Sequence, residues 1–179
     1  YRLRFHVETT QVARVHVTAD QRYELWLDGQ RIGRGPERGD RMNWFYETYD
    51  LHLTPGEHLL VARVWSLDTH GFLAPTAQVS LRHGLLLAAE GPLQKTLSTG
   101  LAPWQGKRLD GYSFAHSPLP GAGAFAGGVI TVDGRKFPWN WHLGEGDGWA
   151  DAIPGRVAYD RWNAWGEISS NHLLRPASL

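Results

Sequence analysis

The chain of 179 residues contains no cysteine, which excludes disulfide bonds, thiolate nucleophiles and cysteine-ligated zinc sites. It also has no net charge, because 18 Lys and Arg side chains balance 18 Asp and Glu side chains. A neutral chain lacks the basic surface typical of proteins that bind nucleic acids or anionic membranes. No apolar run approaches the roughly 20 residues of a transmembrane helix. The sequence therefore predicts neither nucleic acid nor a membrane as a partner.

Tryptophan and glycine are abundant, with nine Trp and 21 Gly, and no stretch has the periodicity of a long amphipathic helix. Apolar and polar side chains instead alternate over residues 1–7, 15–19 and 23–27, which predicts strands. Asp28-Gly29 follows the third run and predicts a type I′ hairpin, because both turn positions require positive φ. The run 58–65 is apolar on both faces, as expected of a central strand that is covered on both sides.

The second half of the chain is richer in Gly, Pro and small residues, and its strand patterns are weaker. A strand is predicted at 129–132, followed by a second hairpin at Asp133-Gly134. Many short strands separated by Gly and Pro turns predict an all-β sandwich or barrel. We expect one domain over residues 1–179, in which 172–179 form a linker to a further domain of a larger protein.

A series of motifs in the first half is similar to a known family. Residues 19–29 read Ala-Asp-Gln-Arg-Tyr-Glu-Leu-Trp-Leu-Asp-Gly, followed by Ile-Gly-Arg-Gly-Pro at 32–36 and Tyr-Glu-Thr-Tyr-Asp-Leu at 46–51. This order resembles the N-terminal galactose-binding-like sandwich of family 78 glycoside hydrolases, the α-L-rhamnosidases. The chain departs from the family pattern at Asp28, which keeps the same turn chemistry, and at His58, where the family usually has Asn.

The resemblance implies an all-β fold, a jelly-roll (galactose-binding-like) β-sandwich with long loops and little helix. It also implies a non-catalytic accessory domain of a bacterial glycoside hydrolase, which packs against the other domains of the same polypeptide and helps to shape the catalytic region. In that family the catalytic carboxylates lie in a downstream (α/α)₆ barrel, so no catalytic residue is assigned to this chain. We expect an exposed apolar patch where that barrel would pack. Secreted, periplasmic and cytoplasmic locations all remain open.

The alternative is a lectin-like module for rhamnose- or galactose-containing plant or bacterial glycans. Such a site requires a flat aromatic ring to stack on the sugar and polar groups for its hydroxyls. The candidate carbohydrate-binding residues form two clusters and one isolated position: Trp44, Tyr46 and Tyr49; Trp139, Asn140 and Trp141; and Trp104. The competing interpretation is that these aromatic side chains fill the core or an interface between domains.

The acidic glycine-rich loop 145–148 is a candidate calcium site, because Glu145 and Asp147 offer the carboxylate oxygens that calcium prefers. A solvated acidic turn is the competing interpretation. Catalysis by a carboxylate pair would require Glu47 and Asp50, or the two acids of this loop, to converge in a pocket. Surface hydrogen bonding is the simpler interpretation of both pairs. The sequence contains no Gly-x-Ser-x-Gly nucleophile motif and no phosphate-binding loop.

Overall fold

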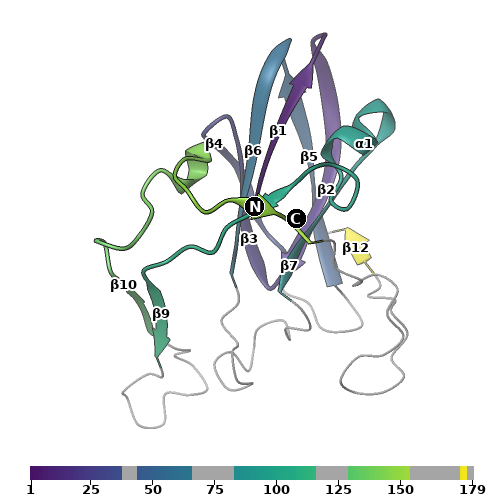
Figure 1. Cartoon of the computed structure of the whole chain (residues 1–179). Coiled ribbons are helices and arrows are strands. Elements are labelled where there is room, and N and C mark those ends of the chain that lie inside the picture. Colours follow the sequence, from purple (N-terminus) through teal and green to yellow (C-terminus); the bar gives the residue numbers. More distant parts are fainter. Residues whose placement is uncertain (38–43, 66–82, 116–128, 154–173, 177–179) are drawn as a thin grey trace.

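Two sheets face each other in the computed structural model, which describes residues 1–37, 44–65, 83–115, 129–153 and 174–176 (Figure 1). The larger sheet has the strand order β11-β8-β1-β6-β3-β4, and the smaller has the order β12-β5-β2-β7. A two-stranded ribbon, β10-β9, projects from them. The strands are β1 (Arg2–Val7), β2 (Gln11–Asp20), β3 (Arg22–Leu27), β4 (Gln30–Gly35), β5 (Trp44–Leu53), β6 (Gly56–Trp65), β7 (Gly84–Ala89), β8 (Gln105–Gly106), β9 (Tyr112–Ala115), β10 (Val129–Val132), β11 (Ala150–Asp151) and β12 (Leu174–Pro176).

Helix is confined to short turns in the described part of the chain: η1 (Gly91–Leu93), α1 (Gln94–Leu97) and η3 (Trp141–Leu143). The predicted all-β sandwich with little helix is therefore confirmed. None of the helices found over the described ranges is long and apolar enough to cross a membrane. Part of the segment predicted as a linker, 174–176, pairs in parallel with β5 at the edge of the smaller sheet.

The core lies between the two sheets and is built from alternate residues of their strands, as the sequence pattern predicts. Full burial of each Val or Leu side chain contributes about 1.5–3 kcal/mol to folding. The side chains with no exposed surface come from both sheets and from α1: Val15, Val17, Tyr23, Leu25, Leu60, Leu87 and Leu97.

The first hairpin forms as predicted, because Asp28 and Gly29 have φ values of 49° and 77°. The Asp28 carboxylate also ties the turn to β6. Its Oδ1 accepts a hydrogen bond from the Leu59 amide at 2.7 Å, and its Oδ2 lies 2.7 Å from Nδ1 of His58. The other ring nitrogen of His58 lies 2.7 Å from the Thr54 carbonyl. Burial lowers the pKa of His58, but these two acceptors outweigh it and the net pKa is raised. The His58 side chain thus connects the turn at Asp28 with the turn at Thr54.

The second predicted hairpin, at Asp133-Gly134, is wrong. Strand β10 pairs only with β9 among the described strands, and the chain after Asp133 turns instead toward η3. The amides of Lys136 and Phe137 both donate to the Asp133 carbonyl, at 3.1 and 3.0 Å. Gly134 does not adopt positive φ. The Asp133-Gly134 pair therefore starts a helical turn that leads toward η3 and not into a strand paired with β10.

Residues 109–112 and 137–141 cover part of the outer face of the larger sheet, which makes β6 a strand with both faces buried. Val61 on this outer face is 1% exposed and packs beneath Phe137 and Trp141. Leu59 and Trp26 extend this second apolar cluster along the sheet. The predicted burial of β6 on both faces is confirmed, and the covering segment leaves a cavity beside the cluster.

Candidate functional site

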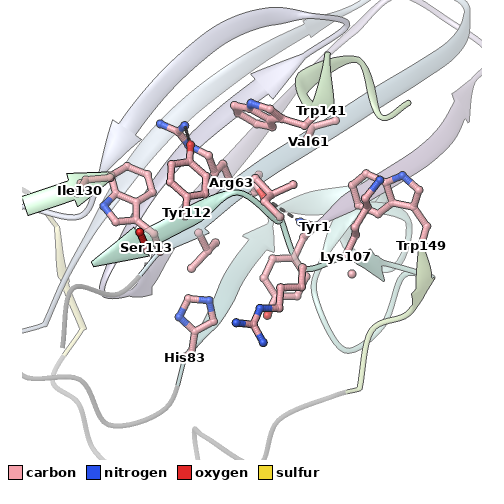
Figure 2. Close-up of a pocket in the computed structure, with 16 residues that line it drawn as sticks. Tyr1, Val61, Arg63, His83, Lys107, Tyr112, Ser113, Ile130, Trp141 and Trp149 are labelled. Carbon is pink, nitrogen blue, oxygen red and sulfur yellow. Dashed lines mark hydrogen bonds between the residues drawn. The ribbon is translucent and has the colours of Figure 1, made fainter. Parts of the chain in front are cut away.

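A cavity of about 890 Å³ opens on the outer face of the larger sheet (Figure 2). This volume falls within the range of small-molecule sites, about 300–1,000 Å³. The walls come from β6, β8, β9 and β10, from the residues just before β1 and β7, and from the turns around η3 and β11. The labelled side chains in Figure 2 point into the same space from these separate segments. The lining is mainly aromatic and cationic: Tyr1, Arg63, Trp65, His83, Lys107, Arg108, Tyr112, Trp141 and Trp149.

Arg63 is the organising side chain of this wall. It stands directly opposite Glu24 in the register between β3 and β6, and its Nη2 lies 2.8 Å from Glu24 Oε2. Its Nη1 donates to the Tyr112 hydroxyl at 2.8 Å. The guanidinium also lies 5.0 Å from the ring centroids of both Trp65 and Trp141. A planar guanidinium serves all these partners at once, which a Lys ammonium would not.

The indole of Trp141 is held edge-on against Trp26, with ring centroids 5.7 Å apart and an interplanar angle of 84°. Arg63 Nε and Trp26 Nε1 are both buried without a hydrogen-bond partner among the described residues. A buried donor without a partner costs free energy, so polar groups of this kind are concentrated where a ligand or water can reach them. Of these two side chains only Arg63 lines the cavity, which makes this wall a candidate ligand site.

The opposite end of the cavity is built around Trp149, which is half-buried. The Arg2 guanidinium lies 4.4 Å from the Trp149 ring, and Lys107 Nζ lies 5.8 Å from it. Arg2 is fixed in turn by the Gln105 side chain at 2.9 Å and by the Gly144 carbonyl. These contacts place an indole and an ammonium group together at the cavity wall.

Two titratable groups of the wall have shifted pKa values. Burial raises the pKa of the Tyr1 phenol. Burial lowers the pKa of His83, although the negative charge of Asp20 acts in the opposite direction. Both side chains are therefore neutral at pH 7, which leaves the fixed positive charge of the cavity to its Arg and Lys side chains.

The structure separates the predicted aromatic residues into groups. Trp141 lies in the cavity wall, whereas Trp139 is 68% exposed and outside the lining, with its Nε1 bonded to the Gly134 carbonyl at 2.9 Å. Asn140 is exposed and has a left-handed φ of 66°. Trp44 and Trp104 are 5% and 4% exposed, and their indole nitrogens donate to Thr18 Oγ1 and the Leu97 carbonyl. These last two side chains pack in the interior.

Tyr46 and Tyr49 lie away from the cavity, on β5. Tyr46 packs edge-on against His16, with ring centroids 5.2 Å apart. The Tyr49 hydroxyl lies 3.0 Å from that of Tyr23, which donates to Glu47 at 2.6 Å. Burial raises the pKa of Glu47, although the hydrogen bonds it accepts oppose this effect. Residues 23, 47 and 49 thus form a closed polar cluster between the sheets.

This cluster explains the Gly-Arg-Gly part of the motif at 32–36. A Cβ added at Gly33 would collide with the Tyr49 ring, and one added at Gly35 would collide with the Glu47 carboxylate. Both glycines are needed because the side chains of β5 lie directly against the backbone of β4. Asp50 points to the other face of β5 and pairs with Arg14 at 2.8 Å, so Glu47 and Asp50 do not converge as a catalytic pair would.

Glu145 and Asp147 are both exposed. The Glu145 carbonyl accepts a hydrogen bond from Trp149 Nε1 at 3.3 Å, which ties the loop to the end of the cavity. Across the ranges that the structure describes, no three His, Asp or Glu side chains gather closely enough to hold a metal ion. Calcium binding at this loop stays a prediction.

Sequence reasoning missed most of the cavity wall, above all Arg63, Tyr112 and Trp149. A signal for Arg63 was present, because a charged residue inside a strand covered on both faces must be paired or must line a site. No such signal marked Tyr112 or Trp149. They reach the cavity from loops and short strands whose placement depends on tertiary contacts.

The comparisons with known proteins support the fold. No protein-family model matches the chain, and no curated protein matches it. Among solved structures, the chain is similar to the crystal structure of a GH78 family rhamnosidase of Bacillus sp. GL1, with a TM-score of 0.58 and 24% sequence identity. The match covers 98% of this chain and 17% of the rhamnosidase chain. The chain therefore shares its fold with a small part of a much longer protein.

Proposed function

We propose that this chain is a non-catalytic accessory β-sandwich of an α-L-rhamnosidase-like glycoside hydrolase, and that it packs against the other domains of the same polypeptide. The observation that carries the proposal is the fold likeness, which spans 98% of this chain but only 17% of the rhamnosidase chain. The motif order at 19–29, 32–36 and 46–51 independently favours the same family.

An exposed apolar surface supports the packing role. Ile130, Val132 and Trp139 are 48%, 46% and 68% exposed, and they lie on the projecting ribbon and on the turn that follows it (Figure 1). Exposed large apolar side chains are typical of surfaces that another domain covers, and Ile130 also lines the cavity described above. We define these three residues as the ribbon patch and propose that it faces the catalytic region.

The first experiment follows the reading frame that encodes this chain. We expect it to continue into an (α/α)₆ barrel, and the complete protein to hydrolyse 4-nitrophenyl α-L-rhamnopyranoside, whereas residues 1–179 alone do not. A stop codon immediately after residue 179, or hydrolysis by this chain alone, would overturn the proposal.

The second experiment tests the ribbon patch by comparing two proteins. The Ile130→Ser, Val132→Ser double variant should leave the melting temperature of residues 1–179 nearly unchanged, because both side chains are already exposed to solvent there. In the complete protein it should lower the melting temperature by about 2–4 °C per kcal/mol of lost packing. Val12→Ser is the matched control, since Val12 is 55% exposed on β2, away from the ribbon. Equal effects of the patch and control variants would exclude the ribbon as the interface.

A second candidate function is glycan binding, which the cavity beside Trp141 favours. Its volume of about 890 Å³ and its aromatic walls are features of a ligand site. We would titrate the chain calorimetrically with L-rhamnose and with galactose oligosaccharides, with and without calcium. Saturable binding that is lost in Trp141→Ala and kept in Trp139→Ala would support this function. Binding lost only in Trp139→Ala would move the site to the exposed turn.

A further inference from the structure

The cavity has a marked positive charge, although the chain as a whole is neutral. Arg63, Lys107 and Arg108 line it, and no Asp or Glu is found among its described lining residues. Glu24, which does not line the cavity, pairs with Arg63 at 2.8 Å, so the charge of Arg63 already has a partner. Lys107 and Arg108 have no acidic side chain within ion-pair distance in the described part of the chain. Two uncompensated cations therefore stand at one side of an otherwise aromatic cavity.

A cavity lined by charge of one sign attracts ligands of the opposite sign, because its low-dielectric walls concentrate the field. The ligand that fits this cavity carries an anionic group for Lys107 and Arg108. Phosphate alone would not explain the rest of the wall, in which Trp149 lies 5.8 Å from Lys107 Nζ and the hydroxyls of Tyr112 and Ser113 line the same space. Indoles stack on sugar rings, and hydroxyls bond to sugar hydroxyls.

We propose that this cavity binds an acidic sugar, with the carboxylate of a uronate unit at Lys107 and Arg108 and its ring against Trp149. The proposal rests on glycan binding as the function of the cavity and adds the class of sugar. It differs from recognition of neutral rhamnose or galactose units, for which uncompensated cations have no use.

The test compares two ligands that share one backbone and differ at their carboxyl groups, which are ionised in one and methyl-esterified in the other. Trigalacturonate and its fully methyl-esterified form have the same rings and linkages, and calorimetric titration at 50 mM salt gives both dissociation constants. We expect the acid to bind at least tenfold more tightly than the ester, since a charge-assisted hydrogen bond contributes about one decade of affinity. The preference should shrink at 500 mM salt, because salt screens exposed charges.

Variants then assign the contacts. Lys107→Gln and Arg108→Gln should each weaken acid binding about tenfold and leave ester binding unchanged. Lys95→Gln is the matched control, because Lys95 is an exposed cation on α1 and does not line the cavity. Trp149→Ala should weaken both ligands, and Trp149→Phe, which preserves an aromatic ring, should restore part of the affinity.

The other outcomes separate the two levels of the proposal. Equal binding of acid and ester would overturn acid recognition and leave glycan binding standing. No binding of either ligand, or of neutral sugars, would overturn both. A triglutamate peptide that binds as tightly as trigalacturonate, without any effect of Trp149→Ala, would assign the cavity to an acidic peptide segment and overturn the sugar proposal.

Discussion

Replacing Arg63 by Met should destabilise the sandwich strongly, because a single guanidinium stabilises the layer that covers the larger sheet. The substitution leaves the Glu24 carboxylate, whose side chain is only 16% exposed, without its 2.8 Å partner. It also removes the hydrogen bond to Tyr112 and the contacts with Trp65 and Trp141. We expect Met to retain most of the apolar packing of the Arg stem, so the loss reports mainly on the charge.

The magnitude follows from these contacts. A hydrogen bond to a charged group contributes about 1.5–3 kcal/mol, and each indole contact about 0.5–1 kcal/mol. Water reaches part of the pair, since Arg63 is 24% exposed, and it offsets some of the loss. We expect a net destabilisation of about 2–4 kcal/mol, a large share of the 5–15 kcal/mol that stabilises a typical domain. With an m-value of about 2 kcal/mol/M, the urea midpoint should fall by about 1–2 M.

A double-mutant cycle separates the ion pair from the other contacts. Arg63→Met should cost about 1–2 kcal/mol less in a Glu24→Gln background, because no carboxylate then loses its nearer cation and keeps only Arg31 at 3.9 Å. The same cycle on Arg14 and Asp50, which are 54% and 43% exposed, is the control and should give a much smaller coupling energy. A loss below about 0.5 kcal/mol for Arg63→Met, or equal coupling in both cycles, would refute the role assigned to Arg63.

Three further predictions concern other contacts. Because folding raises the pKa of His58, the protonated ring stabilises the fold, and this contribution is complete at pH values below the unfolded pKa of about 6.5. It is lost as pH rises through the folded pKa. Urea unfolding should therefore show that His58→Asn is more destabilising at pH 6 than at pH 9. Gly35→Ala should cost about 1–3 kcal/mol in the same assay, because the new methyl group collides with Glu47. Ser98→Ala should cost about 1–2 kcal/mol, because the Ala89 amide loses its 3.0 Å acceptor, Ser98 Oγ.

Each of these three predictions has an experimental outcome that would contradict it. An NMR titration that places the His58 pKa below 6.5, or equal losses for His58→Asn at the two pH values, would refute the first. Gly134→Ala is the control for the second, since a Cβ there would lie 3.6 Å from the Trp139 ring without positive φ, and equal costs would exclude the collision. Rescue of Ala89 by solvent, seen as fast hydrogen exchange of its amide without loss of stability, would contradict the third.

Most of the sandwich could be predicted from alternation alone. The strands at 1–7 and 23–27 each have one fully apolar face, and a period of two is the strongest pattern that a strand imposes on its sequence. The Asp28-Gly29 turn could be predicted because positive φ at both positions restricts the residue types. The prediction at Asp133-Gly134 was wrong because Asp also starts helical turns, and the local sequence does not distinguish the two uses.

The site was predicted less well, because exposure of an aromatic side chain depends on what covers it. Trp44 and Trp141 are both nearly buried, yet one packs in the interior and the other forms the wall of a cavity. Nothing in the residues beside them separates the two outcomes. The described residues 109–112 and 137–141 set the difference, because they pack on the outer face of the larger sheet along a path that no periodicity encodes.

The cations of the cavity divide into two kinds, one that holds the wall together and one that we propose contacts a ligand. Arg63 pairs with Glu24, donates to Tyr112 and lies 5.0 Å from two indole rings, so its charge stabilises the wall. Lys107 and Arg108 line the same cavity but have no acidic partner among the described residues. Substitution of Arg63 should therefore change stability more than charge selectivity, and Lys107→Gln should do the reverse. The opposite result would be that Lys107→Gln lowers stability and that substitution of Arg63 changes charge selectivity. In that case Lys107 would hold the wall and Arg63 would contact the ligand.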